Sequence, residues 1–240
     1  MNNILGIGGS SIVYLVNDRN NTKYALKTIR QDKKFNRRQA SCILMKEVMT
    51  LKAIGPHPNI IGQIDKINCN MEVDASTSQL SGSPLIDGKV VSSMVSAFEY
   101  ASNGTLASFI KQTGPFEEEV ARFFMLQLIH AVNHIHRKEY VHLDIKPQNI
   151  LLDDFFNIKL ADFGSAVDMA DQQAYFDKRR GTPGFMAPEI VNLNTPQGYR
   201  EYDAFGAEMY SIGVTMYVIL TGSLPTGIQI KDEYEEVETD

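Results

Sequence analysis

The sequence predicts an α+β fold built as two lobes, a small lobe rich in strands with one main helix and a second lobe that is mainly helical. Residues 4–30 alternate β-branched and polar residues around Gly and Asn turns, which is typical of strands joined by hairpins. Helical patterns dominate from residue 105 onward, and the change falls at residues 99–103. The predicted organisation is a strand-rich lobe at 1–98, a hinge at 99–104, a helical lobe at 105–225 and an acidic tail at 226–240.

The strand-rich lobe also contains one predicted helix and one long loop. Residues 39–54 space their apolar side chains near a helical period, and the Gly-Pro pair at 55–56 stops the pattern. Residues 66–90 are rich in Ser, Asp and Gly without periodicity, which predicts a long surface loop inserted into the lobe. A further strand is expected within residues 91–100.

The second lobe is predicted from three helical segments. The first is residues 105–113, and the second is residues 117–138, where Pro115 and a run of glutamates suit a helix N-terminus. Short strands follow at 149–154 and 157–162. Residues 209–220 are apolar on all sides, but they are too few to span a bilayer, so we expect a buried helix and no membrane segment.

Composition and charge narrow the class of protein. The 240 residues are 43% hydrophobic and 22% charged, which are ordinary globular values. The net charge of -6 disfavours a nucleic-acid partner. Cys42 and Cys69 show neither metal-type nor disulfide-framework spacing, and the N-terminus lacks the pattern of a secretory signal. These features favour a cytoplasmic location.

A glycine-rich turn lies between the first two predicted strands. Gly6, Gly8 and Gly9 would let backbone N–H groups approach a phosphate closely, and Ser11 stands where a third glycine would complete the pattern. A hairpin turn without a ligand is the alternative interpretation.

Three further residues, Lys27, Glu47 and Asp162, suggest a function because of the residues expected near them. Lys27 lies on a predicted strand and Glu47 on the predicted helix, and an ion pair between them would hold the ammonium group toward a phosphate. Asp162 ends a strand just before Phe163 and Gly164, where its carboxylate could bind Mg²⁺. Taken singly, each residue also fits a structural role, as a solvated charge or a turn.

The ordered set of motifs resembles that of the eukaryotic protein kinases. It consists of the glycine-rich turn, Ala25-Leu26-Lys27, the helical Glu47, HLDIKPQN at 142–149, DFG at 162–164 and GTPGFMAPE at 181–189. The resemblance covers about residues 5–225 in the correct order. It implies a serine/threonine protein kinase that uses ATP and Mg²⁺ to phosphorylate a protein substrate.

The resemblance also implies the roles of individual residues. Asp144 would orient the substrate hydroxyl, Lys146 would steady the γ-phosphate, and Asn149 and Asp162 would bind the metal ions. Thr182 would contact both Asp144 and Lys146. The residues expected around the adenine ring and at the hinge are Val13, Ala25, Phe98, Glu99, Ala101 and Leu151.

The sequence departs from the family at the residue before the catalytic aspartate. Leu143 replaces an arginine that usually pairs with a phosphate on the activation segment. Between Asp162 and Glu189 the hydroxyl-bearing residues are Ser165, Tyr175 and Thr182, and none lies in the usual phospho-threonine stretch. We hypothesise a kinase that is not switched by phosphorylation of this segment.

Other departures concern substrate choice and the second lobe. Thr105 and Gln148 stand where arginine-selecting members carry acids, so selection of upstream arginine is not expected. Glu208 stands for the usual aspartate at the start of the central helix. The family adds several helices after residues 224–225, so we expect a shortened helical lobe. A fragment, a mis-spliced gene model or a protein that needs a partner would each account for it.

A second function remains open at this point. A catalytically weak pseudokinase acting as a binding scaffold would fit Ser11, Leu143 and Glu208. The residues that act directly on the phosphates are all present, which favours the kinase.

Overall fold

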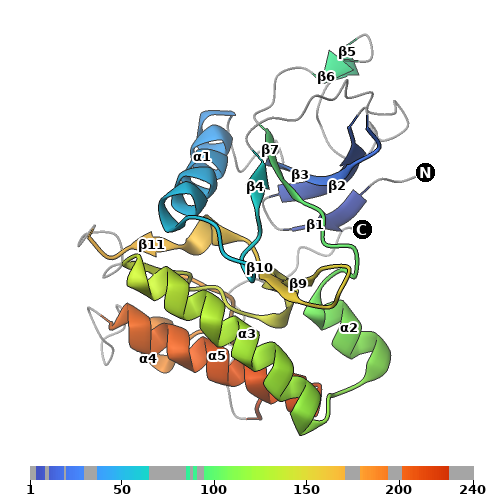
Figure 1. Cartoon of the computed structure of the whole chain (residues 1–240). Helices are drawn as coiled ribbons and strands as arrows, with labels where there is room; N and C mark the ends of the chain where they lie inside the picture. Colours follow the sequence, from blue (N-terminus) through green and yellow to red (C-terminus); the bar gives the residue numbers. More distant parts are fainter. Residues whose placement is uncertain are drawn as a thin grey trace, which may run out of the picture.

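An antiparallel sheet of five strands forms most of the smaller lobe in the computed structural model, and helix α1 lies beside it (Figure 1). The structure describes residues 4–8, 11–18, 20–29, 37–64, 85–86, 89–90, 95–170, 179–193 and 202–226. The strands of the sheet are β1 (Ile4–Ile7), β2 (Ser11–Asn17), β3 (Lys23–Ile29), β4 (Gln63–Ile64) and β7 (Val95–Glu99). Their order is β1-β2-β3-β7-β4, so β3 lies at the centre between β2 and β7.

The carboxylate of Asp18 fixes the turn between β2 and β3. It accepts hydrogen bonds from the backbone N–H groups of Thr22 (2.8 Å) and Asn20 (2.9 Å), and Asn21 takes the left-handed φ of 63° that asparagine tolerates. These bonds favour the charged carboxylate and hold the pKa of Asp18 below its usual value. The turn sets the register that places Val13 opposite Lys27.

Helix α1 (Arg37–Ile54) turns one face toward the protein interior. The helix ends at Gly55, whose left-handed φ of 78° lets its N–H donate to the Leu51 carbonyl at 3.0 Å. Residues spaced by three or four positions share the inner face of a helix. The buried residues of α1 are Leu44, Glu47, Thr50, Leu51 and Ile54.

The loop after α1 is hydrogen-bonded to the larger lobe. The Ile61 N–H donates to the Leu160 carbonyl, and the Leu160 N–H donates to the Asn59 carbonyl, both at 2.9 Å. The Nε2 atom of His134 lies 3.0 Å from the Ile54 carbonyl oxygen. The C-terminal end of α1 is therefore attached to the larger lobe.

A pair of histidine rings packs at this attachment. The rings of His57 and His134 lie 4.9 Å apart between centroids, and the Nδ1 atom of His57 accepts a hydrogen bond from the Asn59 N–H at 3.1 Å. Partial burial and the proximity of basic neighbours hold the pKa of His57 below its usual value of 6.5. These neighbours are His134, His130 and Lys159.

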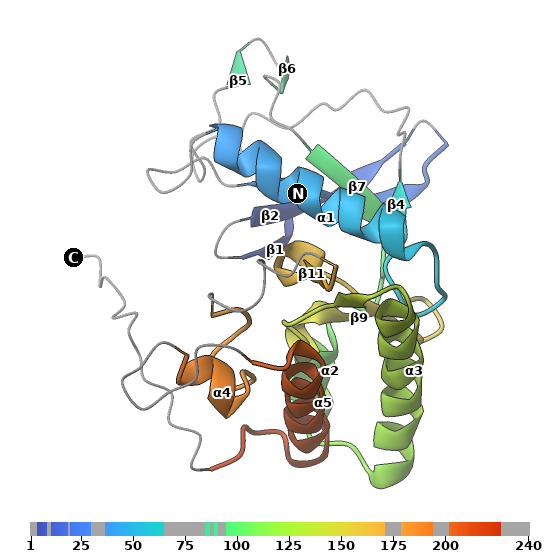
Figure 2. The same ribbon diagram turned by 90° about the vertical axis from the view of Figure 1, so that its left-hand side faces the viewer.

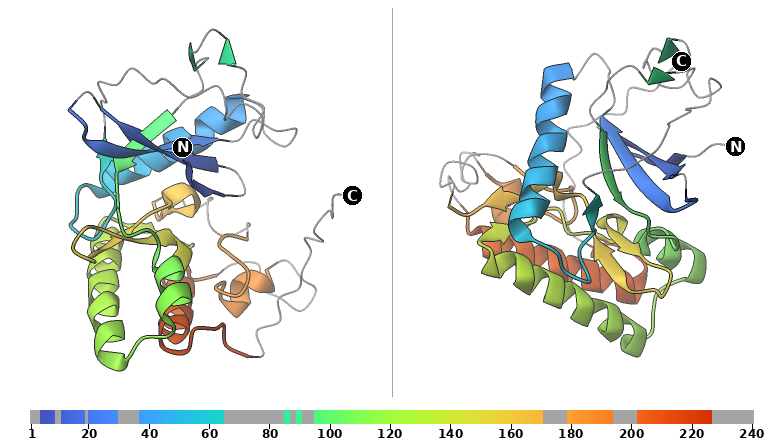
Figure 3. Two further views of the ribbon diagram at one scale, coloured as in Figure 1. Left: turned by 90° about the vertical axis from the view of Figure 1, so that its right-hand side faces the viewer. Right: turned by 45° about the horizontal axis from the view of Figure 1, so that its top comes forward.

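The larger lobe is built on two long helices, α3 (Glu118–Arg137) and α5 (Ala204–Thr221), which lie side by side (Figures 2 and 3). Between these helices and the sheet lies the hairpin of β9 (Ile150–Leu152) and β10 (Ile158–Leu160). The remaining elements are α2 (Leu106–Thr113), α4 (Pro188–Val191), and the paired strands β8 (Tyr140–Val141) and β11 (Val167–Asp168).

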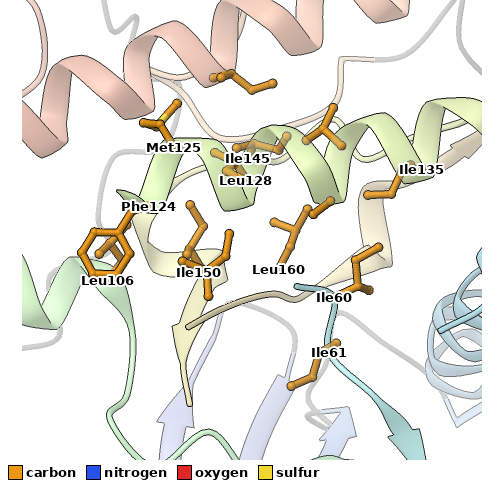
Figure 4. Close-up of a cluster of buried hydrophobic side chains, with 14 of the residues drawn as sticks. Ile60, Ile61, Leu106, Phe124, Met125, Leu128, Ile135, Ile145, Ile150 and Leu160 are labelled. Atoms are coloured by element: carbon orange, nitrogen blue, oxygen red, sulfur yellow. The ribbon is translucent and has the colours of Figure 1, made fainter. Parts of the chain in front are cut away.

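One apolar core joins α3, the β9–β10 hairpin and the loop after α1 (Figure 4). Leu128 and Ile135 extend from α3 toward Ile150 and Leu160 of the hairpin, and Ile60 reaches the same cluster from the loop. All five side chains are buried. Because burial of apolar surface is the main favourable term in folding, this core holds the hairpin that carries the site residues.

The two-lobed α+β fold predicted from the sequence is confirmed. The apolar helix starts earlier than the predicted 209–220, because Asp203 caps α5 by accepting a hydrogen bond from the Phe205 N–H at 3.0 Å. Within the region predicted to be one loop, β5 (Leu85–Ile86) pairs with β6 (Lys89–Val90). Most of that loop and the acidic tail from residue 227 lie outside the described residues.

Helix α5 is the one described helix that is long and apolar enough, by length and composition alone, to cross a membrane. It packs against α3 and carries the fully buried Glu208. Both features are typical of a core helix. The expectation of a wholly buried helix is nevertheless wrong, because only 44% of Ala204–Thr221 is buried, and Met209, Met216 and Tyr217 are exposed.

Candidate active site

Lys27 lies on β3 between two carboxylates that come from distant parts of the chain. Its Nζ atom is 2.8 Å from Asp162 Oδ1 and 2.9 Å from Glu47 Oε2. Burial alone would lower the pKa of Lys27, but the two carboxylates outweigh it and hold that pKa above its usual value. The ammonium group is therefore charged and fixed in direction, as a phosphate-binding group must be.

The two acids on Lys27 respond differently to burial. Burial raises the pKa of Glu47, and Lys27 only partly opposes that effect. At Asp162 burial acts in the same direction, but the charge of Lys27 outweighs it and holds the pKa of Asp162 below its usual value. The carboxylate of Asp162 is the more exposed of the two, which leaves it open to a ligand.

The backbone of Asp162 fixes the direction of its side chain. It takes left-handed dihedral angles (φ 64°, ψ 67°), which are uncommon for a residue other than glycine. Phe163 follows as a fully buried side chain, and its ring meets the ring of His142 edge-on at 4.7 Å. The buried phenylalanine thus fixes the direction of the aspartate before it.

The predicted catalytic residues form one hydrogen-bonded group. The Thr182 hydroxyl donates to Asp144 Oδ1 at 2.7 Å, and Lys146 Nζ lies 3.1 Å from Asp144 Oδ2 and also donates to Thr182. Asn149, in the short helix η2 (Pro147–Asn149), donates through Nδ2 to Asp144 Oδ2 at 2.9 Å. Three donors hold the Asp144 carboxylate in one orientation.

The carboxylate of Glu208 holds the backbone of the catalytic loop by hydrogen bonds. The sequence did not predict this role. The Oε1 atom of Glu208 accepts the backbone N–H of His142 at 2.5 Å and of Leu143 at 2.8 Å. Its Oε2 atom lies 2.5 Å from His136 Nε2. His136 was missed entirely, although a lone acid within an otherwise apolar helix is itself a sign of a buried partner.

The residues expected around adenine line the junction of the lobes. Val13, Ala25 and Leu151 are half-buried, and Phe98 is buried opposite Ala25. Thr105 bridges to Leu151 and so brings the start of α2 against β9.

Glu99 ties the hinge to both lobes. Its carboxylate accepts the Gly62 N–H at 2.7 Å and lies 3.1 Å from Lys159 Nζ on β10. Its backbone N–H donates to the Gly62 carbonyl at 2.9 Å, and Glu99 pairs with Tyr24 across β3 and β7. Ala101 follows two residues later on the same connection and is half-buried.

The glycine-rich turn is described in part. Gly6 pairs with Val13 across β1 and β2, and the Gly8 N–H donates to the Ser11 carbonyl at 2.8 Å. A side chain at Gly6 would meet nothing within 4 Å, so packing does not require glycine there and the backbone lies open to a ligand. Gly9 lies outside the described residues.

The predicted metal ligands fit Mg²⁺. Asp162 offers a carboxylate. The side-chain amide of Asn149 donates its N–H to Asp144, so its carbonyl oxygen can bind a metal. Both are the hard oxygen donors that Mg²⁺ prefers, and Mg²⁺ commonly takes its other ligands from phosphates and water. Among the described residues, no group of three or more His, Cys, Asp or Glu could hold a metal without such ligands.

Comparison with known proteins identifies the family. The family model of the protein kinase domain matches residues 1–240. CBL-interacting serine/threonine-protein kinase 3 of Arabidopsis thaliana is 32% identical over 220 residues, which cover 90% of this chain and 43% of that protein. Death-associated protein kinase 2 of Mus musculus is 33% identical over 228 residues, which cover 92% and 54%.

Serine/threonine-protein kinase cds1 of Schizosaccharomyces pombe is 28% identical over 92% of this chain and 44% of its own length. The chain thus spans about half the length of these curated relatives. The family match covers the whole chain. The chain therefore belongs to the protein kinase domain family.

Proposed function

We propose that this chain transfers the γ-phosphate of ATP to a serine or threonine hydroxyl of a protein. The observation that carries the proposal is the group of Asp144, Lys146, Asn149 and Thr182, joined by hydrogen bonds across the catalytic loop and the segment after it. Phosphoryl transfer needs positioning and charge stabilisation more than covalent chemistry, and this group supplies both.

Each residue has a part in the proposed reaction. Asp144 accepts the hydrogen bond of the substrate hydroxyl and orients its oxygen toward the γ-phosphorus. Lys146 lies 3.1 Å from Asp144 and places a positive charge where the transferring phosphoryl group gathers negative charge. Lys27, fixed by Glu47, positions the α- and β-phosphates. Mg²⁺ held by Asp162 and Asn149 would neutralise charge on the phosphates.

Two observations favour serine or threonine as the acceptor. Lys146 stands two residues after Asp144, the position that is typical of serine/threonine kinases in the family. Two of the relatives described above, CBL-interacting serine/threonine-protein kinase 3 and cds1, are named serine/threonine-protein kinases. We also propose a cytoplasmic location, on the basis of the unpaired, exposed Cys42.

The proposed enzyme does not select arginine upstream of the phosphosite. Thr105 caps α2 by accepting the Ser108 N–H at 3.0 Å, so its hydroxyl is already engaged by the backbone and carries no charge. An arginine-selecting site needs a carboxylate there. Strong enrichment of upstream arginine on a peptide array would contradict this part of the proposal.

Transfer of labelled γ-phosphate from Mg²⁺-ATP to a generic protein substrate tests the function. The chain is compared with Asp144→Asn and with Glu117→Gln, a matched acid-to-amide change at an exposed residue without a side-chain cap bond. Loss of a positioned base costs about 10²- to 10⁴-fold in rate, so Asp144→Asn should lose nearly all transfer, and Glu117→Gln should lose none. Transfer absent from the folded parent chain would instead favour a binding scaffold.

A further inference from the structure

Leu143 combines burial with an unfavourable backbone conformation. It is 3% exposed, and its φ of 60° lies in the left-handed region that branched side chains rarely adopt. Residues in such conformations persist where the surrounding structure over-determines them, commonly at functional sites. Leu143 also immediately precedes Asp144, so whatever holds Leu143 also holds the catalytic carboxylate.

The backbone of Leu143 is held from two sides. Its N–H donates to Glu208 at 2.8 Å. Its carbonyl faces Gly181, where an added Cβ would lie only 2.7 Å from the Leu143 oxygen. Gly181 precedes Thr182, the donor to Asp144, so the catalytic loop and the end of the activation segment touch at Leu143.

The side chain of Leu143 lies in an apolar cluster that is separate from the main core. The cluster contains residues from the strand after the DFG motif, from the segment after Thr182 and from α5. These residues include Val167, Ala187, Ile190, Leu193, Ala204 and Ala207, with Met169 and Met186 packed against it. Residues on both sides of the activation segment therefore share one buried apolar cluster with Leu143.

We propose that Leu143 is a positioning residue that orders the two described ends of the activation segment, residues 162–170 and 179–189, by apolar packing. A leucine cannot bind a phosphate, but it can fill the space between β11, the segment before α4 and α5. These two ends are thereby held against the catalytic loop in the unphosphorylated chain. This inference rests on the proposed function, because the ordered segment serves to seat a protein substrate beside Asp144.

The test compares Leu143→Ala with Leu143→Met, which conserves volume, and with Leu128→Ala, an equally large deletion at a buried leucine of the main core. Trypsin reports local order, because cleavage of a folded chain follows local opening. Arg179 and Arg180 lie just before Gly181, and Arg137 at the exposed end of α3 serves as the internal reference.

In Leu143→Ala we expect cleavage after Arg179 and Arg180 to rise by about tenfold relative to cleavage after Arg137, because a cavity loosens only this cluster. The KM for the protein substrate should rise with it, while binding of an ATP analogue at Lys27 and Asp162 stays unchanged. In Leu143→Met both the cleavage pattern and the KM should stay close to those of the parent chain. In Leu128→Ala trypsin cleavage should accelerate at all sites together.

Two results would overturn the inference. One is a uniform rise in cleavage in Leu143→Ala, as in Leu128→Ala, since that would make Leu143 an ordinary core residue. The other is a rise in cleavage after Arg179 and Arg180 when the parent chain is treated with phosphatase. Because proteolysis needs no activity, a parent chain without phosphate transfer but with the expected cleavage pattern would contradict the proposed function alone.

Discussion

Removing the carboxylate of Glu208 should destabilise the protein through the catalytic loop. The side chain is 0% exposed and accepts two backbone N–H groups, those of His142 and Leu143. In Glu208→Ala both donors lose their acceptor away from water. An orphaned buried donor costs about 1–3 kcal/mol, so the pair should cost about 2–6 kcal/mol. Domains typically have only about 5–15 kcal/mol of stability.

Glu208→Gln separates the hydrogen bonds from the charge. The amide oxygen can still accept both N–H groups, but the interaction of the charged carboxylate with His136 is lost. Charge-assisted hydrogen bonds are about twice as strong as neutral ones, so Gln should cost about half as much as Ala. Glu117→Ala, at an exposed glutamate, should change stability by less than about 0.5 kcal/mol.

Urea unfolding followed by far-ultraviolet circular dichroism measures these differences, since the chain has no tryptophan to serve as a fluorescent probe. The phosphate-transfer rate should fall in the same order, because the loop that carries Asp144 loses its support. A loss below about 1 kcal/mol in Glu208→Ala would refute the reasoning, as it would mean that water or another group satisfies both donors. Equal losses in Gln and Ala would refute the hydrogen-bond part of it.

Two further changes test other parts of the structure. His57 has a lowered pKa when folded, so the unfolded chain binds the proton more readily and stability falls as pH drops below 6.5 toward the folded value. His57→Asn keeps an acceptor for the Asn59 N–H but removes the group that titrates. The urea midpoint of this variant should fall less than that of the parent chain between about pH 7.5 and about pH 5.5. An equal fall in both proteins would contradict the assignment of the pH dependence to His57. Gly181→Ala would place Cβ 2.7 Å from the Leu143 oxygen at a φ of 104°, so kcat/KM should fall at least about tenfold. Gly213→Ala, where nothing lies within 4 Å, is the control, and equal kinetics in the two variants would contradict the predicted clash.

Local patterns explain which elements could be predicted. The glutamates near residue 118 and the long apolar period predicted α3 within one residue at each end. The start of α5 was wrong because the prediction relied on its apolar run and overlooked Asp203 as a cap. The pairing of β5 with β6 was missed although Asp87-Gly88, a common two-residue hairpin sequence, lies between them in the sequence.

The site residues were found through motif order, and their supports were not. Lys27 and Glu47 are 20 residues apart, and their pairing followed from the strand and helix that carry them. His136 and Glu208 are 72 residues apart on different helices, so no local pattern joins them. Contacts of this kind depend on how α3 and α5 pack, which the sequence pattern of either helix leaves undetermined.

Helix α1 belongs to the smaller lobe by its position in the chain, but the hydrogen bonds at its C-terminal end attach it to the larger lobe. Glu47 lies on α1, whose end is fastened to β10 and α3, whereas Lys27 lies at the centre of the sheet. The ion pair of Lys27 and Glu47 therefore joins the centre of the sheet to a helix whose end is attached to the larger lobe. Any change in the angle between the sheet and the larger lobe would change the distance from Lys27 Nζ to the Glu47 carboxylate. The orientation of the phosphate-binding lysine thus depends on how the two lobes are placed.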